Sequence, residues 1–258
     1  MNKQDLASIK SQILQLGAAL DRGQAYNPTS GEYYAEKMQF AKRKIASLIE
    51  HPDRPPLPTS LADFDGEWEL VLTTVPHGIF RSSPFFLAIQ EAYAMGGDTS
   101  KALLFFKLHE LQTCSWGVSK VGRVAQVIDA QTSTFVSEFD TSLFSLTSVP
   151  LLGWGKLLPT FGGRVVTVSK VTGLAADGTL SLEVDYTTAK PVRGLSGLGE
   201  FVWGTKVPVG AVWKLLPWNK GRAAVATIKI RYSDEDFRIM EDVDGEMFIY
   251  TRPVFMEE

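Results

Sequence analysis

The chain has 258 residues, of which 45% are hydrophobic, and a formal net charge of −3, so it can bury a substantial core unaided. Its sequence pI of about 5.7 argues against a nucleic-acid-binding domain, which would carry a basic surface. The single cysteine, Cys114, excludes an intramolecular disulfide. No apolar run approaches the roughly 18 residues of a membrane-spanning helix, and no signal peptide is expected at the N-terminus.

Residues 1–50 are predicted to form a helical pair with one apolar stripe on each helix. Asp5 can cap the first helix, and the glycine of segment 21–23 favours its end. The first stripe consists of Leu6, Ile9, Ile13, Leu14, Leu16 and Leu20. The second, within 31–50, consists of Tyr34, Met38, Ala41, Ile45, Leu48 and Ile49. The basic cluster beside it, either a solvated face or an anionic-lipid contact, consists of Lys37, Lys42, Arg43 and Lys44.

A proline-rich linker at 51–64 is expected to separate this pair from a single domain at 65–258. Within that domain, eight short segments alternate between apolar and polar residues, as strands do. They lie at about 68–74, 121–129, 132–140, 163–172, 179–188, 223–232, 235–240 and 246–252. Asp-Gly turns at 177–178 and 244–245 favour hairpins. The predicted fold class is mainly β: a lipocalin-like eight-stranded antiparallel barrel with an N-terminal helical pair and a helical insertion after the first strand.

A barrel of eight strands has room for packed side chains or for one small ligand. On the first strand, Trp68, Leu70 and Leu72 share one face, and Gly66-x-Trp68 is similar to the entry strand of lipocalins. The other inward candidates are Phe135, Ser137, Phe139, Leu180, Leu182, Val184, Tyr186, Ala224, Ala226, Ile228, Ile230 and Tyr232. Small residues opposite aromatic ones fit a ligand cavity and tight packing equally well.

Two kinds of connection interrupt the strands. The insertion has helical spacing at 84–95 and again from 98 to 111, and such a helical pair is either a lid over a cavity or a plug. The loops at 149–159 and 190–222 carry many apolar residues for loops, so they are expected either to contact a membrane or partner or to fold back over the barrel mouth. The contact candidates are Trp154, Leu157, Leu158, Phe201, Trp203, Trp213 and Trp218.

No catalytic constellation, metal site or cofactor site is predicted, and the protein is not expected to be an enzyme. His51, His77 and His109 have no metal-ligand spacing, and Cys114 has no second cysteine. Segment 194–206 is glycine-rich, but its Gly-Thr-Lys order does not match a phosphate-binding loop.

The acidic turn at 234–236 carries charges close to where a barrel would close. Asp236 and Arg238 alternate onto one face, so they are expected to pair and to point toward the barrel rim or interior. Because a buried charge is costly unless it is paired, the turn is expected to be a structural lock or a polar anchor for a ligand headgroup. A catalytic acid or base is the third role left open, and it would require burial beside a partner such as Arg238 or Arg231.

Four segments in this order resemble the plastid lipid-associated protein family, the plant fibrillins (PAP/fibrillin). They are DGEWELVLTT at 65–74, RSSPFF at 81–86, VGRVAQVID at 121–129, and the pair IRYSDEDFRIM at 230–240 and DGEMFIY at 244–250. The match spans most of the chain after the linker. The long 190–222 insertion departs from the family pattern.

The resemblance implies that the protein binds or carries a hydrophobic isoprenoid or lipid, such as a carotenoid, prenylquinone or fatty acid. It implies a plastid location, at thylakoids or plastoglobules, or a thylakoid association in a cyanobacterium, although no transit peptide is visible. The expected ligand-binding residues are Trp68, Phe135, Phe139, Leu182, Val184, Tyr186, Ile228, Tyr232, Asp236 and Arg238. Peripheral membrane association is expected, and no nucleic acid. The alternative is a non-enzymatic scaffold or accessory subunit that docks on a membrane enzyme or photosynthetic complex.

Overall fold

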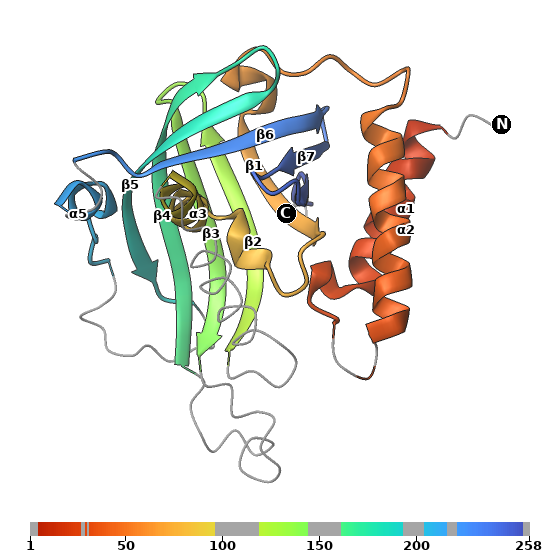
Figure 1. The fold of residues 1–258 in the computed structure, drawn as a ribbon, viewed down its shortest axis with the longest axis horizontal. Helices are drawn as coiled ribbons and strands as arrows, with labels where there is room; N and C mark the ends of the chain where they lie inside the picture. The colour runs from red at the N-terminus through yellow and green to blue at the C-terminus, as the bar shows by residue number, and fades with distance from the viewer. Residues whose placement is uncertain are drawn as a thin grey trace, which may run out of the picture.

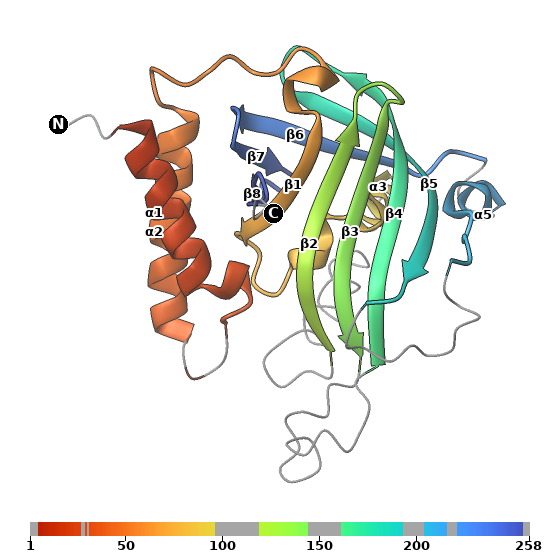
Figure 2. The ribbon, with the colours of Figure 1, turned by 180° about the vertical axis from the view of Figure 1, so that it is seen from behind.

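The structure is a computed structural model that describes residues 5–26, 29, 31–95, 119–143, 161–192, 204–215 and 221–254. This part of the chain is mainly β: eight antiparallel strands pair with their sequence neighbours, and the last pairs with the first, so the sheet closes into a ring (Figures 1 and 2). The strands are β1 (Gly66–Thr73), β2 (Ser119–Asp129), β3 (Thr134–Leu143), β4 (Phe161–Leu174), β5 (Thr179–Lys190), β6 (Val225–Ser233), β7 (Phe237–Glu241) and β8 (Met247–Thr251). All eight predicted strands are therefore confirmed.

The N-terminal helical pair lies outside the ring (Figure 1). The helices α1 (Leu6–Ala19) and α2 (Gly31–Ile49) pack against each other, and they contact β1 and β6. Leu14 of the predicted stripe is 39% exposed, so its assignment to the buried face is wrong. The other described helices are the 3₁₀ segments η1 (Asp21–Gly23), η2 (Leu61–Phe64) and η3 (Ile79–Ser82), with α3 (Pro84–Met95) and α5 (Val209–Leu215). None of the described helices is long and apolar enough to cross a membrane.

Two hydrophobic clusters lie on opposite faces of the sheet. The interior cluster is formed by inward side chains of all eight strands. The helix-side cluster joins α1 and α2 to the outer faces of β1, β6, β7 and β8. Strands β7 and β8 are consequently buried on both faces: Met240 and Phe248 face the interior, whereas Ile239 and Ile249 face the helices.

Register shifts move two predicted inward residues to the helix side. The β1–β8 pairing shifts between Leu70 and Leu72, and the β6–β7 pairing shifts between Ile230 and Tyr232. An extra residue on one strand reverses the alternation that follows it. Leu70 and Ile230 therefore belong to the interior cluster, whereas Leu72 and Tyr232 belong to the helix-side cluster. The predicted inward placement of Leu72 and Tyr232 is wrong.

A third shift turns Tyr186 outward. The β4–β5 register shifts between Val168 and Ser169, so Tyr186 pairs with Val168. The inward position passes to Thr187, whose hydroxyl lies 3.2 Å from the buried hydroxyl of Thr167. The ring of Tyr186 instead carries the Lys206 ammonium 4.5 Å from its centroid, and its predicted inward placement is wrong.

The segment after β1 that contains η3 and α3, residues 79–95, enters the ring; we call it the inserted segment. Ile79 and Phe80 of η3, with Phe86 and Leu87 of α3, are buried members of the interior cluster, and α3 packs against β4, β5 and β6. The predicted helix at 84–95 is confirmed and fills part of the interior. The second predicted helix, at 98–111, lies outside the described residues.

Candidate functional site

Most of the predicted ligand-binding residues are brought together inside the ring. Phe135, Phe139, Leu182, Val184 and Ile228 are buried members of the interior cluster. Trp68 joins them, fully buried, and its indole nitrogen donates a 2.9 Å hydrogen bond to the Phe64 carbonyl. These side chains form an apolar wall.

Arg238 brings a charge into this apolar wall. Its side chain leaves β7 inward and is completely buried. The guanidinium carbon lies 4.6 Å from the ring centroid of Trp68, 4.9 Å from that of Tyr250 and 5.9 Å from that of Phe64. Aromatic faces attract cations at such distances. The aromatic faces do not, however, accept hydrogen bonds from the in-plane N–H groups as an oxygen atom would.

The hydrogen bonds of Arg238 are incomplete. Its Nη2 donates a 2.5 Å hydrogen bond to Oε1 of Gln126 on β2. Within the described part of the chain, Nε and Nη1 donate to no acceptor. Burial, together with the nearby charge of Arg252, lowers the pKa of Arg238 to about 9, while the nearby Tyr250 acts in the opposite direction. The group is therefore still a cation at neutral pH, without a facing carboxylate among the described residues.

Gln126 connects this cation to the rest of the interior. It is fully buried, and its Nε2 donates to the Tyr250 hydroxyl at 2.7 Å and to the Ser82 carbonyl at 3.2 Å. These bonds fix the amide so that its oxygen faces Arg238. Burial raises the pKa of Tyr250, so its hydroxyl stays neutral.

A row of polar residues continues from Gln126 across the inner wall. In register, Gln126 pairs with Ser137, Ser137 with Thr167, and Thr167 with Thr187. The hydroxyl of Ser137 has no hydrogen-bond partner among the described residues. We call Arg238, Tyr250, Gln126, Ser137, Thr167 and Thr187 the polar belt. Buried polar atoms are normally hydrogen-bonded, so the unpartnered atoms of this belt suit a polar group of a bound molecule.

The segments that carry the family resemblance meet at this belt. Trp68 comes from the first, Ser82 from the second, Gln126 from the third, and Arg238 and Tyr250 from the fourth. Comparison with family models, with curated proteins and with solved structures finds no match. The family assignment thus rests on the sequence motifs and stays a prediction.

Gln126 and Tyr250 were not among the predicted site residues. Gln126 gave a usable signal, since it lies between Val124 and Ile128 on the inward face of an alternating strand. A polar residue at such a position points to a buried hydrogen-bonding partner. Tyr250 gave no comparable signal, because an aromatic residue is ordinary in a strand.

The predicted pairing of Asp236 with Arg238 is wrong. Asp236 is exposed and lies 2.7 Å from the ammonium of Lys10 on α1, so its predicted place in the ligand site is not supported. Asp234 lies 2.5 Å from the same ammonium and accepts a hydrogen bond from the Tyr232 hydroxyl at 2.5 Å. The acidic turn therefore attaches α1 to the ring, which is the structural-lock role.

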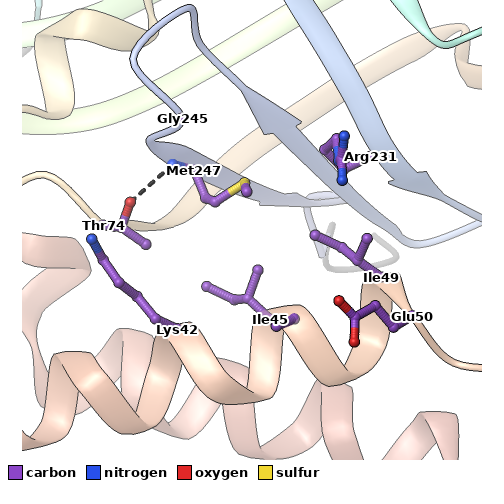
Figure 3. Close-up of a pocket in the computed structure, with 9 residues that line it drawn as sticks. Lys42, Ile45, Ile49, Glu50, Thr74, Arg231, Gly245 and Met247 are labelled. Carbon is purple, nitrogen blue, oxygen red and sulfur yellow. Dashed lines mark hydrogen bonds between the residues drawn. The ribbon is translucent and has the colours of Figure 1, made fainter.

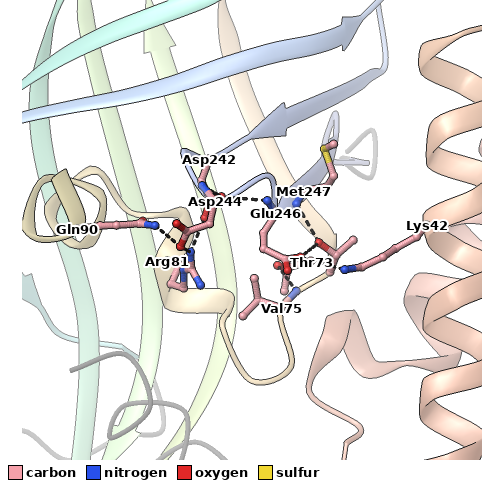
Figure 4. Close-up of polar contacts among 10 residues, drawn as sticks. Lys42, Thr73, Val75, Arg81, Gln90, Asp242, Asp244, Glu246 and Met247 are labelled. Carbon is pink, nitrogen blue, oxygen red and sulfur yellow. Dashed lines mark hydrogen bonds and ion pairs between the residues drawn. The ribbon is translucent and has the colours of Figure 1, made fainter. Parts of the chain in front are cut away.

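A second acidic turn, between β7 and β8, holds the inserted segment (Figure 4). Arg81 lies 2.7 Å from Asp242 and 2.8 Å from Asp244, and Gln90 of α3 also donates to Asp244. Burial raises the pKa of Asp242, while the charge of Arg81 lowers it. On the helix side of this turn, Glu246 accepts a hydrogen bond from Thr74.

A pocket of about 240 Å³ lies outside the ring, between α2 and the ends of β6 and β8 (Figure 3). Its wall combines apolar side chains with charges of both signs. The lining includes Lys42, Ile45, Glu50, Thr74, Arg231 and Met247. Lys42 lies 3.3 Å from Glu246, so its charge is already offset. This pocket shows no unpaired buried group that would select a ligand.

Of the predicted membrane or partner contacts, one, Trp213, lies in the part of the chain that the structure describes. Trp213 of α5 is half-buried against the interior cluster, as expected where the loop folds back, while its neighbour Leu215 is 81% exposed. Membrane or partner contact by Trp213 stays a prediction. Trp154, Leu157, Leu158, Phe201, Trp203 and Trp218 lie outside the described residues. No group of three or more potential metal ligands occurs in the described ranges.

Proposed function

We propose that the protein binds a hydrophobic isoprenoid or lipid molecule, such as a carotenoid, prenylquinone or fatty acid, inside the ring. The observation that supports this is the polar belt: buried polar atoms without partners inside an otherwise apolar closed sheet. A mainly apolar wall with a few placed polar groups is typical of small-molecule sites. In this proposal the closed sheet is a lipocalin-like barrel of the PAP/fibrillin family.

The proposed setting is the surface of a thylakoid or plastoglobule membrane. The outward face of α2 supports it, because Tyr33 and Phe40 are exposed there at 58% and 39%. Basic side chains flank both rings: the Lys37 ammonium lies 5.4 Å from the Tyr33 centroid, and that of Lys44 lies 5.2 Å from the Phe40 centroid. Aromatic rings among basic residues suit the headgroup layer of anionic lipid.

The alternative function is a non-enzymatic scaffold that docks on a membrane enzyme or photosynthetic complex. One observation favours it: Phe80, Phe86 and Leu87 of the inserted segment occupy part of the interior. If side chains of the protein itself fill the closed sheet, the protein would bind partners through its outer surface alone.

Native mass spectrometry and solvent extraction of the full chain, purified from its own membranes, would separate these functions. We expect a stoichiometric isoprenoid or lipid in the wild type. A Leu182→Trp variant should lose it, because Leu182 is buried in the interior. The matched control is Val168→Trp, since Val168 pairs with the outward Tyr186 on the neighbouring strand. A wild-type protein without bound lipid that co-purifies with a membrane complex would favour the scaffold.

A further inference from the structure

No carboxylate of the described residues faces the buried cation Arg238. A guanidinium has five N–H donors, and a buried charge is costly unless it is both paired and hydrogen-bonded. Here the oxygen that Arg238 contacts belongs to a neutral amide, that of Gln126. The donors on Nε and Nη1 have no acceptor within the described ranges.

The surroundings add positive charge to this position. The guanidinium carbon of Arg252 lies 3.9 Å from the Trp68 ring centroid, and that of Arg238 lies 4.6 Å from the same centroid. Arg252 donates hydrogen bonds to the carbonyls of Glu235 and Glu67, both at 3.2 Å. These acceptors are neutral, and the charge of Asp65 partly offsets that of Arg252, since it raises the Arg252 pKa against the effect of burial. Arg238 has no such carboxylate among the described residues.

We propose that Arg238 binds the carboxylate of an amphipathic acid whose apolar tail lies along the interior wall. This assignment rests on the proposed function and names the ligand class, an acid with a long apolar chain. A carboxylate carries one negative charge and two acceptor oxygens, which match one cation with unused donors. The flat walls made by Trp68 and Tyr250 suit a planar headgroup. A phosphate would require more donors than Arg238 offers, since the amide nitrogen of Gln126 already donates to Tyr250 and Ser82.

The headgroup position is preorganised. Gln126 is held by Tyr250 and the Ser82 carbonyl, so its oxygen fixes one edge of the Arg238 guanidinium. The remaining donors, on Nε and Nη1, have no acceptor to give up among the described residues, and a guanidinium that is already fixed lowers the entropic cost of binding. Gln126 and Tyr250 are thus positioning residues, and Arg238 makes the contact with the ligand.

The test compares palmitate with hexadecanol, which has the same chain length and no carboxylate, on the delipidated full-length protein. We expect calorimetry to show palmitate binding about 10- to 100-fold more tightly, as for hydrogen bonds to a charged group. In Arg238→Met, the preference for palmitate over hexadecanol should be lost. The control Arg252→Met should keep the preference, because Arg252 donates to backbone carbonyls.

Thermal unfolding gives an independent result. Palmitate should raise the melting temperature of the wild type and not that of Arg238→Met. If Arg238→Met does not fold, the carboxylate assignment is tested by whether the wild type binds palmitate more tightly than hexadecanol.

Two outcomes overturn the carboxylate assignment while leaving hydrophobic binding intact. One is equal affinity of the wild type for palmitate and hexadecanol. The other is a palmitate preference that survives in Arg238→Met. Failure of both probes to bind the wild type would overturn the assignment together with the fatty-acid form of the proposed function, and extraction of the native protein would then test the isoprenoid form.

Discussion

The guanidinium of Arg81 and the carboxylate of Asp242 form a buried ion pair of 2.7 Å between positions 161 residues apart in the chain. Arg81 belongs to the segment that enters the ring, and Asp242 begins the turn from β7 to β8 (Figure 4). The carboxylate also accepts hydrogen bonds from the backbone nitrogens of Asp244 and Glu246, at 2.9 and 3.0 Å. One side chain thus shapes the turn and anchors the inserted segment.

We predict that Asp242→Ala lowers the free energy of unfolding by about 3–5 kcal/mol, because it leaves the buried Arg81 without its nearest counter-charge. Urea denaturation measures the loss. Asp244→Ala is the matched control, since Asp244 lies 2.8 Å from the same guanidinium but its side chain is 48% exposed. An exposed partner should contribute about 1 kcal/mol or less. Equal losses in the two variants would contradict the anchoring role of Asp242.

Gly17 sets the distance between α1 and the ring. A Cβ at this position would lie 2.5 Å from the carbonyl oxygen of Val71 on β1. Glycine inside a helix normally costs roughly 1 kcal/mol relative to alanine, so its presence here reflects close packing.

We predict that Gly17→Ala destabilises the protein by about 1–3 kcal/mol, as overpacking does, despite the better helix propensity of alanine. Chemical denaturation shows whether the substitution lowers or raises the free energy of unfolding. In the control Gly31→Ala, at the first residue of α2, the nearest atom to the new Cβ is a Tyr26 ring carbon at 3.8 Å. That substitution should be neutral or stabilising. A stabilising Gly17→Ala would mean that α1 does not pack as closely as described.

The strands could be predicted because the alternation of apolar and polar residues and the positions of the Asp-Gly turns indicate the same strands. The Asp-Gly turns at 177–178 and 244–245 join consecutive strands, and positions such as Phe135, Ser137 and Leu182 point inward as alternation requires. The predicted helices at 84–95 and in the N-terminal pair follow from apolar spacing in the same way. Local periodicity was sufficient for these elements.

The faces after each register shift could not be predicted, since a single extra residue leaves no periodic signal. Leu72, Tyr186 and Tyr232 each follow such a shift, and each lies on the outer face. The partner of Arg238 was missed for another reason. Asp236 is its neighbour in sequence, but the contact is made by Gln126, which lies 112 residues away and depends on closure of the sheet.

The turn between β4 and β5 carries a carboxylate, Asp177, whose protonation should lower the free energy of unfolding. Asp177 lies 3.0 Å from the Lys229 ammonium on β6 and accepts a hydrogen bond from the Thr179 backbone nitrogen at 3.1 Å. The bond from Lys229, with those from Thr179, lowers the pKa of Asp177 to about 2 from its ordinary value of 3.8. The folded state therefore binds this proton less tightly than the unfolded state.

The sign of the pH dependence follows from that difference. A lowered folded-state pKa gives stability that is fully present above about pH 4 and is lost as the pH falls toward about 2. We predict that Asp177→Asn is less stable than wild type above about pH 4 and that the difference shrinks on acidification. Urea denaturation across this range measures it. Asp185→Asn, at an exposed position on β5, is the control, and high salt should reduce the effect because Asp177 is exposed. A wild-type advantage that stays constant down to about pH 2 would show that the Lys229 contact does not form in solution.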